Sequence, residues 1–207
     1  MTVNATPARF IAFEGGEACG KSTQARMLAD ALGAVLTHEP GATGLGARLR
    51  ELLLDPATGH VDPHAEALLM AADRAQHVAD VVRPALEAGR HVVTDRFAGS
   101  SLAYQGFGRG LPIDEIGRLS RWATGGVWPD LTILIDVPIA VAATRLGSDR
   151  DRFERAGDGF HQRVRDGFLE LAASDPQHWV VVDGTPPLDS VAAVVREAVA
   201  ERLDLRM

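Results

Sequence analysis

The sequence predicts an α/β fold in which a parallel sheet of five strands lies between two layers of helices. Short apolar runs alternate with longer stretches of helical periodicity, which is typical of parallel sheets with helical crossovers. The first apolar run is followed at once by the glycine-rich stretch FEGGEACGKSTQ and then by a helical pattern. The chain of 207 residues, 46% of them hydrophobic, is long enough for the core of one domain over 1–207.

Five short apolar runs are the predicted strands, and valines mark HVVTD as a buried one. These strands cover 9–14, 34–38, 91–95, 131–137 and 179–183. Helical segments cover 21–32, 45–54, 63–89, 100–105, 113–123, 138–146, 160–173 and 187–203. Gly33 stops the first helix, Pro40 and Gly41 break the chain after the second strand, and Pro84 predicts a kink. The polar, aperiodic stretch GSDRDRFERAGDG predicts a loop, with a small mobile lid at about 147–158.

Charge and cysteine content limit the partners and the compartment. A net charge of −7 argues against binding a nucleic acid polymer through a basic surface. Cys19 is the only cysteine, so no internal disulfide can form, and a reducing compartment is favoured. The N-terminus lacks the apolar core of a secretory signal, and no run is long enough to span a membrane. We therefore expect a cytoplasmic protein with no membrane partner and a flexible tail at 1–8.

The stretch after the first strand fits the pattern of a loop that binds phosphate groups. Gly15 and Gly20 bracket four residues and are followed by Lys21 and Ser22, which is the G-x-x-x-x-G-K-[ST] pattern of P-loop NTPases. Glycine lets the backbone curl so that N–H groups point inward, the lysine reaches the β and γ phosphates, and the serine can hold Mg²⁺. The helix that follows aims its positive end at the anion.

Two further candidate sites follow the second and third strands, because ligands of parallel sheets bind beyond the carboxyl ends of the strands. Asp95 ends an apolar strand, which suits a carboxylate at Mg²⁺, and the Arg96 guanidinium can grip a phosphate at two points. A surface salt bridge for Arg96 and a core position for Tyr104 are the alternatives. Glu14 and Glu17 flank the phosphate loop, so they face a ligand hydroxyl or a cation, unless they face solvent or pair with an arginine.

Five motifs in order along 9–203 give the sequence a resemblance to the thymidylate kinases, a family of nucleoside monophosphate kinases. They are FEGGEACGKSTQ, EPGATGLGARLR, LLMAADRAQH, DRFAGSSLAYQGFGRG and DRFERAGDGFHQRV. The resemblance implies a three-layer P-loop fold, ATP and dTMP as substrates, Mg²⁺ as the metal held by Ser22 and Asp95, and a homodimer. It implies ATP contacts from Gly15, Gly16, Glu17, Ala18, Cys19, Gly20, Lys21, Ser22, Thr23 and Arg145.

The resemblance also implies a binding site for the acceptor nucleotide. Glu17 would meet the sugar 3′-hydroxyl, Arg96 the phosphate, and Arg74 the thymine edge, while Tyr104 would press against C2′ and exclude a ribose hydroxyl. The remaining acceptor residues that it implies are Glu39, Pro40, Arg50, Met70, Ser100, Ser101 and Gln105, with a cis peptide before Pro40.

The sequence departs from the family pattern at three places. Met70 stands where the family often has phenylalanine, and its flexible thioether covers a base less rigidly than an aromatic ring. His38 replaces a frequent arginine, so a cation is expected to be missing there at neutral pH. The segment 136–151 is slightly shorter than in many relatives.

The phosphate loop lacks the arginine that one branch of the family carries there, because positions 18 and 19 are Ala and Cys. The lid instead holds several arginines, among them Arg150 and Arg152, as in the branch whose lid supplies the catalytic cations. Phosphoryl transfer concentrates negative charge, which these arginines would stabilise together with Lys21, Arg96 and the Mg²⁺ that Asp95 would help to hold. A solvated charged loop is the alternative.

The implied reaction is in-line attack of a dTMP phosphate oxygen on the γ-phosphorus of ATP, which gives dTDP for dTTP synthesis. A nucleoside monophosphate has a second pKa of about 6, so it needs no general base at pH 7. A kinase for another acceptor, or a regulatory module that binds nucleotide without transfer, are the alternatives.

Overall fold

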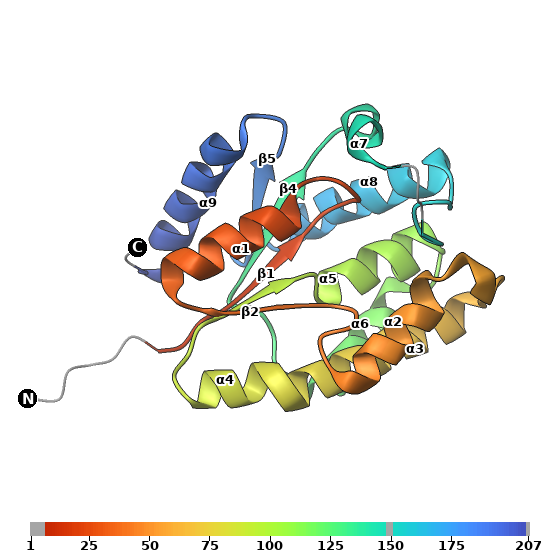
Figure 1. The fold of residues 1–207 in the computed structure, drawn as a ribbon, viewed down its shortest axis with the longest axis horizontal. Coiled ribbons are helices and arrows are strands. Elements are labelled where there is room, and N and C mark those ends of the chain that lie inside the picture. Colours follow the sequence, from red (N-terminus) through yellow and green to blue (C-terminus); the bar gives the residue numbers. More distant parts are fainter. Residues whose placement is uncertain (1–6, 148–150, 206–207) are drawn as a thin grey trace, which may run out of the picture.

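The computed structural model describes residues 7–147 and 151–205, and its centre is a parallel sheet of five strands (Figure 1). The strands are β1 (Phe10–Glu14), β2 (Val35–His38), β3 (Val92–Asp95), β4 (Leu131–Asp136) and β5 (Trp179–Asp183). They lie in the order β2-β3-β1-β4-β5, and every neighbouring pair is parallel. The predicted fold class and the five predicted strands are therefore confirmed.

Helices cover both faces of the sheet, and each predicted helical segment begins and ends within three residues of a helical segment in the structure, counting the π-helical turns described below. The α-helices are α1 (Lys21–Leu32), α2 (Gly44–Leu54), α3 (Pro63–His77), α4 (Arg83–Glu87), α5 (Ala98–Ser101), α6 (Ile113–Thr124), α7 (Ile139–Arg145), α8 (Asp158–Ser174) and α9 (Leu188–Leu203). Gly33 ends α1 in a left-handed conformation, at φ 59°, as the sequence predicts. Glycine adopts this conformation without strain because it has no Cβ atom.

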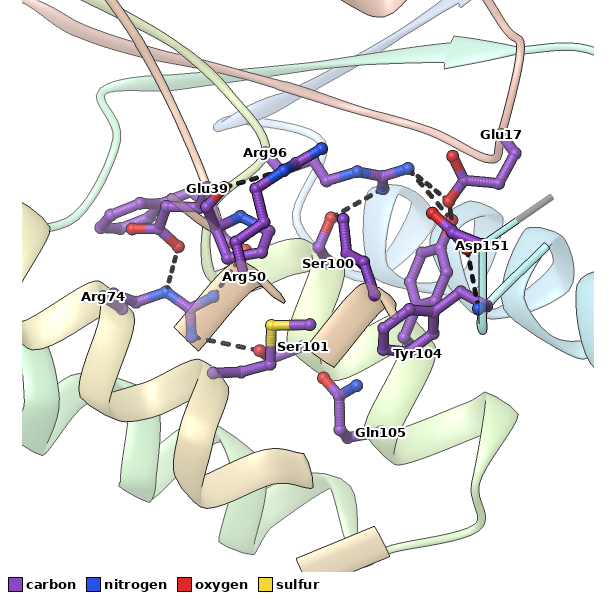
Figure 2. Close-up of a pocket in the computed structure, with 15 residues that line it drawn as sticks. Glu17, Glu39, Arg50, Arg74, Arg96, Ser100, Ser101, Tyr104, Gln105 and Asp151 are labelled. Atoms are coloured by element: carbon purple, nitrogen blue, oxygen red, sulfur yellow. Dashed lines mark hydrogen bonds and ion pairs between the residues drawn. The ribbon is translucent and has the colours of Figure 1, made fainter. Parts of the chain in front are cut away.

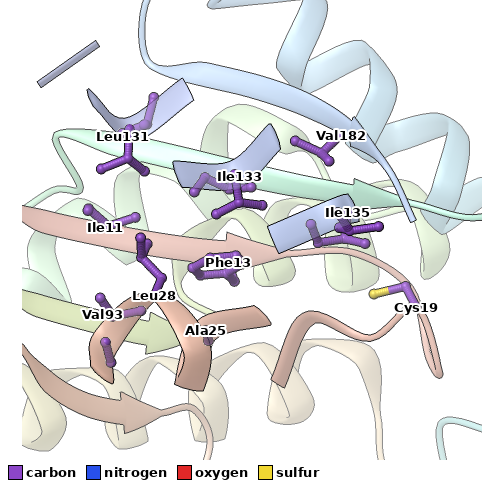
Figure 3. Packing of buried hydrophobic residues seen from close by; sticks show 14 of the residues in the cluster. Ile11, Phe13, Cys19, Ala25, Leu28, Val93, Leu131, Ile133, Ile135 and Val182 are labelled. Atoms are coloured by element: carbon purple, nitrogen blue, oxygen red, sulfur yellow. The ribbon is translucent and has the colours of Figure 1, made fainter. Parts of the chain in front are cut away.

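Strand β1 is buried on both faces, and its side chains alternate between two apolar clusters. Ile11 and Phe13 pack against residues of α1 and α9, in the cluster that Figure 3 shows. Phe10 and Ala12 face the opposite side, where they contact a cluster with residues of α4 and α5. Because β1 is the central strand, this double burial fixes the position of the loop that follows it.

Three short segments differ from the predicted helices. The long helix at 63–89 contains a π-helical turn, η2 (Val78–Val82), just before Pro84, which cannot donate a backbone hydrogen bond. The helix predicted at 100–105 is α5 followed by a second π-helical segment, η3 (Leu102–Gly108). A 3₁₀ turn, η1 (Pro56–Thr58), follows α2 and was not predicted.

The register brings the candidate sites to one edge of the sheet. Asp95 pairs with Phe13 of β1 and with His38 of β2, so the segments after these three strands start at the same level. The predicted tail lies largely outside the described residues, as do residues 148–150 of the predicted lid. Within the described ranges, every helix is too short or too polar to cross a lipid bilayer.

Candidate active site

The loop between β1 and α1, residues 15–22, has the geometry of a phosphate-binding loop. Gly15 adopts φ 145°, and a Cβ there would lie 2.6 Å from the Ile135 carbonyl oxygen, so only glycine fits. The Lys21 ammonium is buried beside the loop and donates to the Gly16 carbonyl oxygen at 3.0 Å. A curled glycine loop, a lysine and the N-terminal end of a helix are together suited to bind the phosphates of a nucleotide.

Ser22 and Asp95 meet beside this loop. The Ser22 hydroxyl donates to Oδ2 of Asp95 at 2.5 Å, and the other carboxylate oxygen, Oδ1, is buried without a hydrogen-bond partner among the described residues. A hydroxyl and an unsatisfied carboxylate oxygen are the hard ligands that Mg²⁺ prefers. The described ranges contain no group of three His, Cys, Asp or Glu side chains for a metal, so water and phosphate oxygens would complete the coordination.

A cavity adjoins the loop, and Figure 2 shows the side chains that surround it. Every residue that the resemblance assigns to the acceptor nucleotide lines this cavity: Glu17, Glu39, Pro40, Arg50, Met70, Arg74, Arg96, Ser100, Ser101, Tyr104 and Gln105. These side chains come from the phosphate loop, the loop after β2, α2, α3, the turn after β3, α5 and η3. Segments far apart in the sequence therefore converge on one hollow next to the phosphate loop.

Arg96 lies at the end of the cavity nearest the phosphate loop, and both terminal nitrogens of its guanidinium are held. Nη1 donates to the Gly15 carbonyl oxygen at 3.0 Å and to the Ser100 hydroxyl at 3.1 Å. Nη2 donates to Oε1 of Glu17 at 2.7 Å and to the Tyr104 hydroxyl at 3.2 Å. The Tyr104 hydroxyl in turn donates to the same Glu17 oxygen at 2.6 Å.

The charges of this cluster are fixed at neutral pH. Burial alone would raise the pKa of Glu17, but the charges of Arg96 and Lys21 and the Tyr104 hydroxyl outweigh it and lower the pKa to about 2. Burial raises the pKa of Tyr104 well above its ordinary value, so this hydroxyl keeps its proton. Glu17 is therefore a carboxylate whose Oε1 accepts two hydrogen bonds, while Oε2 accepts none from the described residues.

Arg74 lies deep beneath the cavity, with only 2% of its surface exposed. Nε donates to Glu39 at 2.8 Å, Nη1 to the hydroxyls of Ser101 and Ser120 at 3.2 and 3.3 Å, and Nη2 to the Phe97 carbonyl oxygen at 3.0 Å. Four of the five N–H groups are thus bonded to described residues, which fixes the plane of the guanidinium.

The loop after β2 is tied to the same network. Glu39 also bonds Nδ1 of His77 at 2.8 Å, and the Glu39–Pro40 peptide is cis, as the resemblance implies. Arg50 donates to the Pro40 carbonyl oxygen at 2.8 Å. Burial and the Arg50 charge lower the pKa of His38, so this side chain is neutral at pH 7 and supplies no cation, as expected.

A model of the thymidylate kinase family matches residues 13–195 of the chain. The chain belongs to the thymidylate kinase family. It is 51% identical over 198 residues to the thymidylate kinase of Leifsonia xyli subsp. xyli, which covers 92% of this chain and 93% of that protein. It is 45% identical over 200 residues to that of Cutibacterium acnes, which covers 94% and 98%. The crystal structure of thymidylate kinase from Ehrlichia chaffeensis superposes with a TM-score of 0.78, at 32% identity, over 93% of this chain and 98% of that one.

A thymidylate kinase of this similarity is a nucleoside monophosphate kinase, which transfers a phosphoryl group from ATP to dTMP and forms dTDP. The identity extends over nearly the whole length of the chain and of these relatives. The function that the sequence predicts is therefore confirmed, and a regulatory module without transfer activity is not supported.

Two of the arginines to which the sequence assigns catalysis or ATP contact, Arg152 and Arg145, are bonded to other groups of the chain in the structure. Arg152 donates through Nε to the Leu53 carbonyl oxygen at 2.8 Å and pairs through Nη1 with Glu66 at 2.6 Å. Both Nη atoms of Arg145 donate to the Gly184 carbonyl oxygen at 3.2 Å. Arg150 lies outside the described residues, so the predicted catalytic roles of the lid remain predictions.

Cys19 is a core residue of the phosphate loop rather than a surface one. Its side chain is 3% exposed and packs in the apolar cluster with Phe13 and Ile135 (Figure 3). The sulfur lies so close to Gly15 that a Cβ there would be 2.8 Å from it. The thiol therefore fills space beneath the loop, and any ATP contact at this position would come from the backbone.

Four residues that line the acceptor cavity were not predicted: Leu54, Phe97, Asp151 and Phe153. Phe153 comes from the lid segment and packs edge to face against the Tyr104 ring, with centroids 5.8 Å apart. A single aromatic residue in the polar lid stretch was the available signal for it. The sequence left open whether Glu14 faces solvent, an arginine or a ligand. In the structure its side chain is 0% exposed and does not line the cavity.

Proposed function

We propose that dTMP binds in the cavity of Figure 2, with its phosphate at Arg96, its sugar between Glu17 and Tyr104, and its thymine near Arg74 and Met70. The observation that carries this proposal is the convergence of these side chains, from separate segments, on one hollow beside the phosphate loop. The free oxygen of Glu17 is available for the 3′-hydroxyl, and the one remaining N–H of Arg74 is available for a base carbonyl.

The phosphates of ATP would lie in the loop 15–22, with Lys21 near the β and γ phosphates. Ser22 and Asp95 would hold Mg²⁺, since their oxygens fit this ion and one of them lacks a partner. When bound, the ion supplies positive charge that neutralises the phosphate oxygens during transfer.

The protein's part in transfer is to hold two polyanions in line and to exclude water. Nη2 of Arg96 donates to Glu17 and Tyr104 in the structure. An arriving phosphate would replace these two groups as the acceptor of the Nη2 hydrogen bonds. The dTMP phosphate is largely a dianion at pH 7, with a second pKa of about 6, and attacks without a base.

Arg150 and Arg152 would stabilise the transferred phosphoryl group, and Arg145 would contact ATP. For Arg152 this requires release from Glu66 and from the Leu53 carbonyl oxygen, which now hold it. Closure of the lid over the nucleotides would be that movement.

An ADP-release assay with dTMP, dUMP, dCMP, thymidine and thymidine ribonucleotide as acceptors tests the site. The wild-type protein should prefer dTMP, and Tyr104→Ala should gain activity on the ribonucleotide relative to dTMP, because the ring no longer fills the space at C2′. An unchanged ratio in the variant would rule out Tyr104 as the sugar selector.

We further propose that two copies of the chain form a homodimer through α3 and α6. Trp122 is 82% exposed and Leu68 is 59% exposed, and they line one groove with Leu119 and alanines of α3. An exposed apolar face of this kind is typical of an interface between proteins. Trp122→Glu should convert the dimer to a monomer in light scattering, and an unchanged mass would contradict this interface.

We also propose a cytoplasmic location for the enzyme. Its two substrates, ATP and dTMP, and its unpaired Cys19 support a reducing compartment inside the cell. Cell fractionation with an antibody against the chain would test this.

A further inference from the structure

Glu14, the last residue of β1, is a carboxyl group that the reaction leaves without a role. It is 0% exposed, yet it accepts three hydrogen bonds. Oε1 accepts from the backbone N–H of Phe97 at 3.0 Å and of Ser100 at 2.9 Å, and Oε2 accepts from the Ser100 hydroxyl at 2.5 Å. A buried carboxyl group without hydrogen bonds would destabilise the fold, so these three donors are what allow Glu14 to lie in the interior.

All three donors belong to the turn that carries Arg96. The Phe97 N–H follows Arg96 directly, and Arg96 itself has φ 71°, a left-handed conformation that non-glycine residues rarely adopt. The Arg96 N–H is tied to the Phe13 carbonyl oxygen at 2.8 Å. Adjacent residues of β1 therefore hold the backbone on both sides of Arg96, and a strained residue persists only where its surroundings fix it in this way.

The Ser100 hydroxyl carries the same link to the guanidinium. It donates to Oε2 of Glu14 and accepts from Nη1 of Arg96 at 3.1 Å. Because the Ser100 hydroxyl donates its hydrogen to Glu14, its oxygen lone pairs are free to accept from Arg96. Nη1 also donates to the Gly15 carbonyl oxygen, so both of its N–H groups are held, while Nη2 bonds Glu17 and Tyr104, which line the cavity.

The space around the carboxyl group is also fixed. A Cβ on Gly99 would lie 2.7 Å from Oε1 of Glu14 and 2.8 Å from the Trp179 ring. Gly99 has an ordinary helical conformation, so close approach to Glu14 and Trp179, and not backbone freedom, is what requires glycine there.

We propose that Glu14 is a positioning residue for dTMP, which acts through Ser100 and the turn at 96–97 to aim Arg96 at the acceptor phosphate. This inference rests on the proposed role of Arg96. It predicts a defect that is mainly in use of the acceptor, because Lys21 is held through the Gly16 carbonyl oxygen, a bond in which neither Glu14 nor Arg96 takes part.

The test is Glu14→Gln, measured as KM for dTMP and for ATP. The amide donates to Ser100 where the carboxylate accepts, so the hydroxyl loses its acceptor and its hold on Arg96 weakens. We expect KM for dTMP to rise about tenfold while KM for ATP stays within about twofold, which a general loss of folding would not produce. Equal changes in both constants, or none, would overturn the proposal.

A double-mutant comparison shows whether the effect passes through Arg96. In an Arg96→Ala background, Glu14→Gln should add no further increase in KM for dTMP, since the group that it positions is gone. The same tenfold increase in both backgrounds would mean that Glu14 acts elsewhere. A wild-type KM for dTMP in Arg96→Ala alone would refute the proposed phosphate site. A raised KM in Arg96→Ala together with a wild-type KM in Glu14→Gln would refute only the role proposed for Glu14.

Two further variants keep the test decisive if Glu14→Gln folds poorly. Ser100→Ala removes the bridging hydroxyl, and Gly99→Ala pushes on the carboxyl group; both should raise KM for dTMP more than KM for ATP. Asp130→Asn is the matched control, because Asp130 accepts from the Phe10 N–H at 2.7 Å at the opposite end of β1. The control should leave both constants unchanged.

Discussion

Replacement of Arg96 by alanine should weaken use of dTMP far more than use of ATP. The side chain donates four hydrogen bonds, three of them to residues that line the cavity: Glu17, Ser100 and Tyr104. A bond to a charged group contributes roughly 1.5–3 kcal/mol, so loss of the phosphate contact should lower kcat/KM for dTMP by about 10- to 150-fold. The alanine also removes the cation that holds the pKa of Glu17 at about 2, so this pKa should rise.

The measurement is a coupled assay of ADP release at varied dTMP and saturating ATP, with thermal unfolding recorded for each variant. Arg96→Lys keeps the charge but loses the planar fork, so its kcat/KM should fall between those of the wild type and the alanine variant. Arg202→Ala is the control. Arg202 lies on the last turn of α9 and, like Arg96, donates to backbone carbonyl oxygens, in its case those of Pro176 and Gln177. Wild-type kcat/KM in a folded Arg96→Ala protein would refute the reasoning.

Three other perturbations have outcomes that the structure fixes. Gly15→Ala should abolish binding of a fluorescent ATP analogue, because a Cβ would lie 2.6 Å from a carbonyl oxygen, and retained affinity would contradict the loop geometry. Burial raises the pKa of Glu14 from 4.5 to about 7, so its contribution to stability is complete below pH 4.5 and is lost as pH rises through 7. Between pH 4.5 and 7 the wild type should lose up to about 3 kcal/mol of its free energy of unfolding through this group, and Glu14→Gln should remove that loss. Urea titrations at several pH values measure it, and the same pH dependence in both proteins would argue against the raised pKa. Arg152→Ala should lower the free energy of unfolding by roughly 1.5–3 kcal/mol, the contribution of a bond to a charged group, because Glu66 then keeps Arg109 as its one cationic partner among the described residues. An unchanged Tm would show that the pair contributes nothing.

Local patterns were sufficient to predict the sheet and the edge of it at which the candidate site residues lie. The helix at 21–32 was predicted to the residue, since the glycine loop starts it and Gly33 ends it. The candidate acceptor residues could be expected to lie together because the carboxyl ends of parallel strands share one edge and because the motifs of the family lie in order along the chain; their roles stay predictions.

Features that depend on distant partners could not be predicted in this way. The π-helical segment at 102–108 shifts backbone bonds by one residue, and no local pattern in the sequence marks it. Arg152 lies 86 positions from Glu66, so a charge in a polar loop gave no sign of its partner. The surroundings of Glu14 depend equally on a turn more than 80 residues away.

The four hydrogen bonds that Arg74 already donates limit how the base preference proposed for this cavity could change over time. The Arg74 guanidinium donates to a carboxylate, two serine hydroxyls and a backbone oxygen from three parts of the chain: the loop after β2, the segment 97–101 and α6. Reorienting Arg74 toward a different base would break several of these bonds at once, whereas Met70 lines the same cavity with a flexible, apolar side chain. Selection for unnatural pyrimidines should accordingly act on the adaptable methionine first and leave the buried arginine in place.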